Sequence, residues 1–236
     1  MATGPAGSRF VTKIYIGDLD GNVWRFTLTL DASLKPAMTA TTKLYSAGAD
    51  QPIVNSMATV NVGGTSQYIF FGTGGDRLPG TDKDTVNHLL GVLDNGVAVP
   101  GAKALDQALT KTAGSGTDIN VDEKVTSFPA VAGDIVFFTT TTFKPALPCS
   151  LPDARLYAFT FIGGAAYDST GDNTITAADT PVVKTIAGER ATAPTVVDQH
   201  LVLGAGGRIS VFGDSEDYNN GVGQAGVRIL SWREVR

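Results

Sequence analysis

Residues 125–141 read VTSFPAVAGDIVFFTTT, and this stretch decides the class of fold. A first apolar run starts beside a proline, Gly133-Asp134 follows in a turn position, and a second run consists of β-branched and aromatic residues. A proline is tolerated at the start of a strand because its missing N–H is not needed there. A short glycine-containing turn between two such runs is typical of a hairpin. The stretch therefore predicts two antiparallel β-strands.

The same order of apolar run, turn and apolar run recurs along the chain. Two further copies also open on a proline, and their turns fall at residues 63–64 and 198–199. Strands with strict alternation are predicted at residues 155–159 and 208–212. The repeated units are expected at about residues 10–48, 51–93, 125–161 and 191–236, with an insertion at 162–186. Units of three or four antiparallel strands at this spacing are typical of β-propeller blades, and a β-sandwich is the alternative.

The composition indicates the same class of fold. The 236 residues include 28 Gly, 28 Thr and 19 Asp but only four Glu. Helix-rich domains favour Glu and avoid Gly, whereas Thr suits strands and Asp suits turns. Apolar residues make up 42% of the chain, which argues against disorder. The chain is predicted to be all-β, with one short helix considered at residues 102–111.

The charge pattern excludes one class of partner. The net charge is −5, and Lys and Arg are scattered without a basic run, so nucleic acid and anionic membranes are not expected as partners. No apolar stretch approaches the roughly 18 residues that a bilayer crossing requires. The first eight residues lack the charged and apolar regions of a secretory signal, which predicts a cytoplasmic protein or a piece of a longer one.

Few residues suggest catalysis. The single cysteine, Cys149, has no internal partner for a disulfide and is interpreted as a spare thiol. The two histidines, His88 and His200, lie in unrelated contexts, so no histidine triad or zinc site is predicted. Glycine clusters at residues 72–75 and 204–207 are interpreted as turns, because no helix follows to help bind a phosphate. We expect a protein that is not an enzyme.

The inserted segment contains DSTGDNTITAAD at residues 168–179. Counted from its first residue, oxygen-bearing groups fall at positions 1, 3, 5, 7 and 12, namely Asp168, Thr170, Asp172, Thr174 (through its carbonyl) and Asp179. This is the spacing of a Ca²⁺ loop, in which alternate residues point inward and a distal acid closes the shell. Asn173 replaces the usual Gly at position 6, and Asn also tolerates positive φ. The segment resembles dockerin-type loops and predicts a Ca²⁺ site, with a plain Asx-rich loop as the alternative.

A second acidic group, residues 18–22 (DLDGN), also carries alternating oxygen ligands. An alternating strand, VWRF at residues 23–26, follows it at once. We therefore interpret residues 18–22 as a hairpin turn between two strands rather than as a metal site.

Residues 15–26 (YIGDLDGNVWRF) resemble the blade motif in the C-terminal β-propeller of the PilY family, the type IV pilus tip-associated adhesins and assembly factors. Further matching stretches are residues 51–53, 70–74, 148–149 and 227–234. The resemblance covers nearly the whole chain but only the later part of that propeller. Family members carry an EF-hand-like Ca²⁺ loop in the propeller. The acidic run that usually precedes the motif is replaced here by residues 7–10 (GSRF), and the loop at 168–179 lies elsewhere.

The resemblance implies a secreted protein at the pilus tip or cell surface. It would act in pilus extension and surface attachment, with pilus subunits or minor pilins and a host or abiotic surface as partners, and with Ca²⁺ as its cofactor. A seven-bladed propeller needs more chain than this, so about four quinoprotein-like blades would be completed by a second polypeptide, a missing segment or closure with fewer blades. The alternatives are a quinoprotein-like dehydrogenase and a periplasmic propeller scaffold.

Overall fold

The computed structural model describes residues 1–4, 10–62, 66–75, 85–96, 103–113, 119–144, 149–172, 174–197 and 200–212. Within these ranges the chain forms strands and no helix, so the prediction of an all-β chain is confirmed. The described residues therefore contain no helix that could cross a membrane. The predicted turns at 63–64 and 198–199, Pro148, and the stretch at 227–234 lie outside the described residues.

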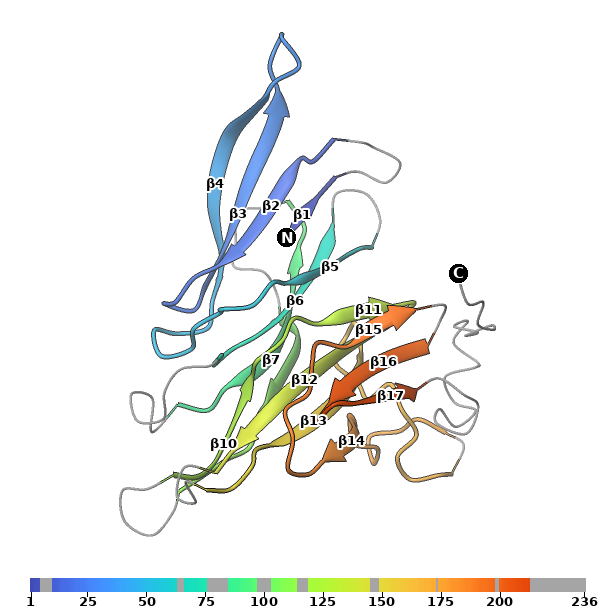
Figure 1. Cartoon of the computed structure of the whole chain (residues 1–236). Coiled ribbons are helices and arrows are strands. Elements are labelled where there is room, and N and C mark those ends of the chain that lie inside the picture. Colours follow the sequence, from blue (N-terminus) through green and yellow to red (C-terminus); the bar gives the residue numbers. More distant parts are fainter. Residues whose placement is uncertain are drawn as a thin grey trace.

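The strands form four sheets, in which every named strand pair is antiparallel (Figure 1). Sheet 1 contains β1 (Ala2–Thr3), β2 (Lys13–Gly17), β3 (Asn22–Leu30) and β4 (Pro36–Ser46). Sheet 2 contains β5 (Ala58–Asn61), β6 (Gln67–Gly72), β7 (His88–Asp94) and β8 (Lys103–Ala108). Sheet 3 contains β9 (Lys111–Ala113), β10 (Ile119–Val125), β11 (Ala130–Ala132), β12 (Ile135–Phe143), β13 (Asp153–Thr160) and β14 (Val182–Ile186). Sheet 4 contains β15 (Thr195–Val197), β16 (His200–Ala205) and β17 (Arg208–Phe212).

The stretch that decides the fold class forms the predicted hairpin. β11 and β12 pair through a turn in which Gly133 has φ of 57°, a conformation that favours glycine. β12 reads IVFFTTTTF, and all of its residues except the last are buried. It pairs with β13 along eight residues, from Ile135 opposite Thr160 to Thr142 opposite Asp153. β12 is therefore covered on both faces.

The prediction of a short helix at residues 102–111 is wrong. Residues 103–108 form β8, which pairs with β7 and buries Leu105 between sheets 2 and 3. A helix this short is marginal in water, because its nucleation fixes several residues for a single hydrogen bond. Pairing with the open edge of β7 and burial of the Leu105 side chain outweigh the weak preference of these residues for a helix.

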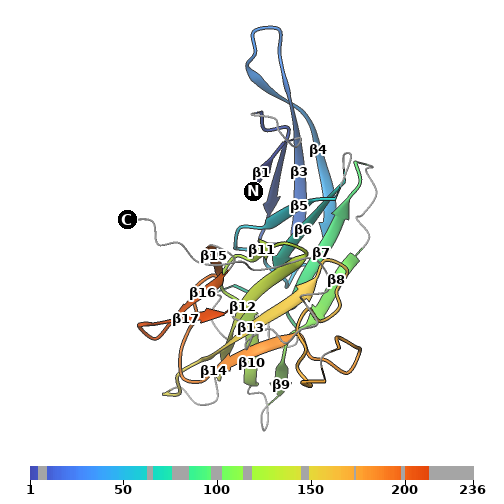
Figure 2. The same cartoon turned by 90° about the vertical axis from the view of Figure 1, so that its right-hand side faces the viewer.

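The four sheets follow one another across the molecule in chain order (Figures 1 and 2). A hydrophobic core lies between each consecutive pair of sheets. Sheet 1 packs on sheet 2 around Tyr15 and Phe71, sheet 2 on sheet 3 around Phe70 and Phe138, and sheet 3 on sheet 4 around Phe137 and Leu203. The first strands of sheets 2 and 4, β5 and β15, both contact β11 of sheet 3. The β3–β4 hairpin projects away from the other sheets.

A buried ionic cluster joins sheet 1 to sheet 2. The carboxylate of Asp94, at the end of β7, has no solvent exposure. The Tyr15 hydroxyl donates to Asp94 Oδ2 at 2.6 Å, Lys13 Nζ lies 3.1 Å from the same oxygen, and Arg25 Nη1 donates to Oδ1. Burial alone would raise the pKa of Asp94, but hydrogen bonds from Tyr15, Gly96 and Lys13 hold that pKa below its usual range.

Replacing Asp94 tests how strongly this cluster holds the two sheets together. Asp94→Asn is expected to lower the free energy of unfolding by about 3–5 kcal/mol, because it leaves the buried cations uncompensated. Lys144→Gln is the matched control, since it removes the partly exposed Lys144–Asp153 pair and should cost about 1 kcal/mol or less. Denaturant unfolding at neutral pH measures both values, and equal losses would contradict the prediction.

Comparing the parent protein with Asp94→Asn at several pH values gives a test of pH dependence. Because the folded-state pKa of Asp94 is depressed, the stability it contributes is present above about pH 4 and is lost as the pH falls through the folded-state value. The difference in stability between the parent and Asp94→Asn should therefore shrink on acidification. A difference that grows toward acid pH would show that the Asp94 carboxylate is not held as an anion.

Candidate functional site

The loop with Ca²⁺ spacing, residues 168–179, lies between β13 and β14 at the edge of sheet 3. Before the loop, Ala166 N donates to Ala158 O at 3.2 Å. After the loop, Ala158 N donates to Pro181 O at 2.9 Å. Both ends of the loop are thus held by one residue of β13, which fixes the place where the loop leaves the sheet.

The structure brings two of the predicted ligands together. Asp168 and Asp179 are buried, whereas Thr170, Asp172 and Thr174 are exposed. Thr170 N donates both to Asp168 Oδ1 and to Asp179 Oδ1, at 3.1 Å in each case. Because one amide reaches both carboxylates, the first and last residues of the loop lie close together.

Backbone amides of the loop surround these two carboxylates. Gly171 N donates to Asp168 Oδ1 at 2.7 Å, and Ser169 N donates to Asp179 Oδ1 at 2.9 Å. Thr176 N donates to Asp179 Oδ2 at 2.7 Å. The hydrogen bonds that Asp179 accepts, first of all the one from Thr176 N, lower the pKa of Asp179 from its ordinary value. The loop therefore stabilises the anionic form that a cation would need.

The third carboxylate belongs to a local turn. Asp172 Oδ1 accepts from Thr174 N at 2.9 Å and from Thr174 Oγ1 at 2.7 Å. Within the described part of the chain, no group of three or more His, Cys, Asp or Glu side chains is placed to hold a metal ion. The hard oxygen donors suit Ca²⁺, and two of the three acids converge. Asn173 lies outside the described residues. The calcium site stays a prediction.

The second acidic group forms the expected hairpin turn between β2 and β3. Asp18 Oδ1 accepts from Asn22 N at 2.8 Å, and Oδ2 accepts from Trp24 Nε1 at 2.7 Å. Gly21 has φ of 75°. Burial would raise the pKa of Asp18, but the bonds from Trp24 and Asn22 outweigh it and lower the pKa. Asp18 thus acts as the hydrogen-bond acceptor that closes the turn.

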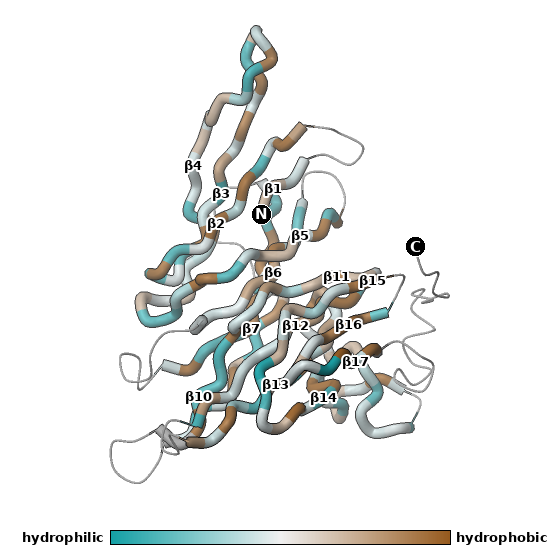
Figure 3. Tube along the Cα trace, in the orientation of Figure 1, coloured by the Kyte–Doolittle hydropathy of each residue, from teal (hydrophilic) through white to brown (hydrophobic). Residues whose placement is uncertain are grey.

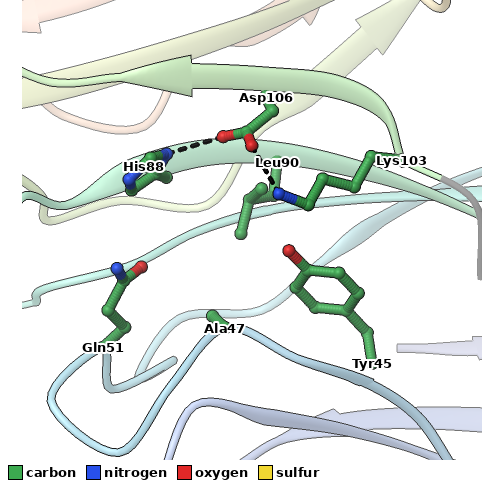
Figure 4. Close-up of a pocket in the computed structure, with 7 residues that line it drawn as sticks. All are labelled: Tyr45, Ala47, Gln51, His88, Leu90, Lys103 and Asp106. Carbon is green, nitrogen blue, oxygen red and sulfur yellow. Dashed lines mark hydrogen bonds and ion pairs between the residues drawn. The ribbon is translucent and has the colours of Figure 1, made fainter. Parts of the chain in front are cut away.

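A small polar cavity lies between sheet 1 and sheet 2 (Figure 4). Its volume is about 60 Å³, and seven residues line it: Tyr45, Ala47, Gln51, His88, Leu90, Lys103 and Asp106. The Asp106 carboxylate lies between the imidazole of His88 and the ammonium group of Lys103, with Oδ1 at 2.6 Å from His88 Nδ1 and Oδ2 at 2.6 Å from Lys103 Nζ. Organic ligands usually occupy roughly 300 Å³ or more, so this cavity suits a water molecule or a small ion.

Nothing in the sequence indicated this cluster. His88 and Asp106 are 18 residues apart and meet only because β7 pairs with β8. Burial would raise the pKa of Asp106, but the bonds from Lys103 and His88 lower it, and the bond to Asp106 raises the pKa of Lys103. Residues 103–108 (KALDQA) do not alternate between apolar and polar side chains, so the sequence contained no strand signal that could have placed Asp106 beside His88.

An apolar hollow of about 400 Å³ lies where β5 and β11 approach each other. Its lining residues are Met1, Ser56, Met57, Ala58, Thr59, Phe128, Pro129 and Val131. Phe128 is 50% exposed there. None of the lining side chains is titratable, so the hollow suits apolar contact rather than acid–base chemistry.

Comparison with known proteins finds a partial relative. A segment of 99 residues is 35% identical to the type IV pilus biogenesis factor PilY1 homolog of Xylella fastidiosa strain Temecula1. The segment is 40% of this chain and 8% of that protein, so the match covers less than a tenth of the relative's length. No family model and no solved structure matches the chain. Part of this chain is thus similar to part of a PilY1 homolog.

Removing Asp179 should open the loop at residues 168–179. Asp179→Ala deletes the acceptor for the amides of Ser169 and Thr176, so these two amides should exchange their hydrogens faster, by about tenfold for each 1.4 kcal/mol of lost protection, whereas the Thr170 amide keeps Asp168 as an acceptor. Hydrogen exchange with mass spectrometry, in the presence of a chelator, measures the change. Asp172→Ala is the control, because it removes only the bonds to Thr174. Equal exchange in the two variants would contradict the role given to Asp179.

Proposed function

We propose that this chain is part of a non-catalytic, type IV pilus-associated protein that acts in pilus assembly, extension and surface attachment. The observation that carries the proposal is the 35% identity over 99 residues to a protein named as a type IV pilus biogenesis factor. The acidic net charge and the absence of a basic run leave nucleic acid an unsuitable partner. Pilus subunits or minor pilins, and a host or abiotic surface, are the proposed partners. The proposed location is extracellular, at the pilus tip or cell surface, with a role in cell adhesion.

The four sheets are proposed to be consecutive blades of a β-propeller of the quinoprotein-like type. Three observations support this arrangement. Each sheet is built mainly from strands that follow one another along the chain, consecutive sheets pack face to face, and the first strands of sheets 2 and 4 contact β11. Propeller blades are antiparallel sheets arranged one after another around a central channel. A rigid stack of this kind would present its loops to partners without large rearrangement.

Calcium is proposed to order the loop at residues 168–179. Asp168 and Asp179 would hold the ion, and Asp172, Thr170 and the Thr174 carbonyl would complete the oxygen set. The support for this is the convergence of two buried carboxylates on one amide. Bound Ca²⁺ would supply the positive charge that offsets the repulsion among three acids. The chain's own contribution is to hold both ends of the loop at Ala158.

The calcium proposal predicts a stability change that depends on the ion. Ca²⁺ at about 100 times its dissociation constant should stabilise the parent by about 2.7 kcal/mol, or roughly 5–10 °C in melting temperature. Asp172→Ala should lose most of this gain and melt like the parent in chelator, because its own hydrogen bonds are local. Asp31→Ala is the control, since Asp31 caps a similar exposed turn through Ser33 N and Lys35 N. A parent that melts equally with Ca²⁺ and with chelator would refute the proposal.

The pilus role predicts a cellular phenotype. Deleting the coding region in the source bacterium should reduce surface pili and twitching, and returning it should restore both. Immunoblots of pilin sheared from cells and the diameter of twitching zones measure the effect. Normal piliation in the deletion strain would contradict the role. An absorbance scan of the purified chain tests the proposal that the protein is non-catalytic. A bound quinone in that scan would contradict this proposal and favour a quinoprotein-like dehydrogenase.

A further inference from the structure

The edge strands β8, β9 and β14 of sheets 2 and 3 are short or covered. β9 has three residues and β14 has five, so each leaves few unpaired backbone groups. β8 has six residues, but Gly163 packs so closely on it that an added Cβ would lie 2.8 Å from Ala104 O. Natural sheets use both devices, because an exposed edge offers its N–H and C=O groups to any extended chain. These three edges are therefore protected against the addition of another strand.

The edge strand β4 of sheet 1 lacks this protection. It is eleven residues long, and among the described strands it pairs only with β3. Residues 36–41 are all exposed, and the run 37–42 (AMTATT) contains no charge and no proline. Alternate residues of an antiparallel strand direct their N–H and C=O groups away from the partner strand. Since the chain continues through described residues from β4 into β5, this open row of donors and acceptors does not lie at an end of the described chain.

The turn at the tip of the β3–β4 hairpin holds β4 in an extended conformation. Asp31 Oδ1 accepts from Ser33 N at 2.8 Å and from Lys35 N at 2.9 Å, and Asp31 N donates to Lys35 O at 2.9 Å. The closed hairpin projects away from the other sheets, with hydrophilic and hydrophobic residues mixed along its length (Figure 3). A partner strand would meet an edge that is already ordered, so less conformational entropy is lost on binding.

Two exposed lysines flank the uncharged run 37–42. Lys35 precedes it and Lys43 follows it, and this spacing corresponds to about 26 Å along a strand. The acidic residue of the hairpin, Asp31, is engaged with backbone amides of the turn. Two copies of β4 paired along their length, in either direction, would place lysine beside lysine, and like charges in opposite positions are destabilising. The charge pattern therefore disfavours a second copy and favours a strand with acidic residues near both ends.

We propose that β4 is a docking edge for an extended acidic segment of another protein, which adds to sheet 1 as a further strand. The segment would span about nine residues, with Asp or Glu near both ends and no proline in the paired part. Backbone hydrogen bonds would supply most of the affinity, and ion pairs with Lys35 and Lys43 would set the register. The small side chains of Ala37 and Ala40 leave room for larger residues of the partner. The proposal depends on the edge and its charges, and not on the pilus role or on calcium.

A peptide of the sequence ETVTVTVTE, capped at both ends, tests whether a strand adds to β4. Added at about 1 mM, it should slow the hydrogen exchange of alternate amides in residues 37–42, measured residue by residue by NMR. The peptide ETVTPTVTE is the control, because proline lacks an N–H and does not fit inside a paired strand. It should bind at least about tenfold more weakly. Unchanged exchange in β4 with the first peptide, or equal protection by both peptides, would overturn the proposal.

Exchanging the charges tests the part given to the two lysines. A chain carrying both Lys35→Glu and Lys43→Glu should bind ETVTVTVTE roughly tenfold more weakly and should prefer KTVTVTVTK, because two attractive pairs become repulsive. Fluorescence anisotropy of labelled peptides measures the affinities. Arg208→Glu is the matched control, since it reverses an exposed charge on β17 and should keep the preference of the parent. A preference that the double variant leaves unchanged would contradict the proposed charge recognition.

Two further measurements check the fold and the choice of partner. Both lysines are exposed, so the double variant should melt at the temperature of the parent, which shows that lost binding is not lost folding. In the absence of peptide, exchange of the β4 amides in the parent should not depend on protein concentration. Protection that grows with concentration would overturn the choice of another protein and favour a second copy. Failure of the pilus or calcium experiments leaves these results unaffected.

Discussion

Burial of both faces of the inner sheets is the constraint on which the rest of the structure depends. β12 contributes residues to two cores, with Val136 and Phe138 facing sheet 2 and Ile135 and Phe137 facing sheet 4. A strand that is apolar on both sides loses its stabilisation if either neighbour is removed, since the effect scales with the apolar area taken out of water. Sheet 3 therefore requires both neighbours, and it lies between sheets 2 and 4.

Apolar packing alone would leave the relative position of two sheets loosely defined, because it has no preferred direction. Two buried carboxylates add directional contacts, one between sheets 1 and 2 and the other between strands of sheet 3. Asp94 binds Tyr15, Lys13 and Arg25 across the first interface. Within sheet 3, Glu123 of β10 accepts from the Tyr157 hydroxyl at 2.7 Å and from Arg155 Nη1 at 2.7 Å. A charge without exposure is costly unless each partner occupies its place, so these groups penalise a slipped arrangement.

The sequence was sufficient where the signal is local. The turn at Gly133 and the apolar strand after it followed from neighbouring residues, as did the turn closed by Asp18. Contacts between distant residues were not predictable. His88 meets Asp106, and Tyr15 meets Asp94, only after strands have paired and sheets have stacked. The strand at 103–108 was mistaken for a helix because its pairing with β7 is also a tertiary effect.

The loop at residues 168–179 combines the two situations. Its spacing is a local signal that predicts a Ca²⁺ site, and the structure brings Asp168 and Asp179 of that loop together, since both accept from Thr170 N. Whether Asp172 joins them depends on a competition, because Thr174 already donates two hydrogen bonds to it. A cation must outweigh those bonds to recruit the third carboxylate. The bonds are exposed and local, so each contributes only about 1 kcal/mol.

That competition has a consequence for sheet 3. β14 begins at Val182, three residues after Asp179, and pairs at the edge of the sheet with β13. Its residues Lys184 and Thr185 are exposed, and Val182, Val183 and Ile186 are only partly buried where they pack against the cores on the two sides of sheet 3. Segments of this kind open locally at far lower free energy than a buried core. A cation bound between Asp168 and Asp179 would therefore act on the attachment of β14, while the stacked sheets around β12 would stay as they are.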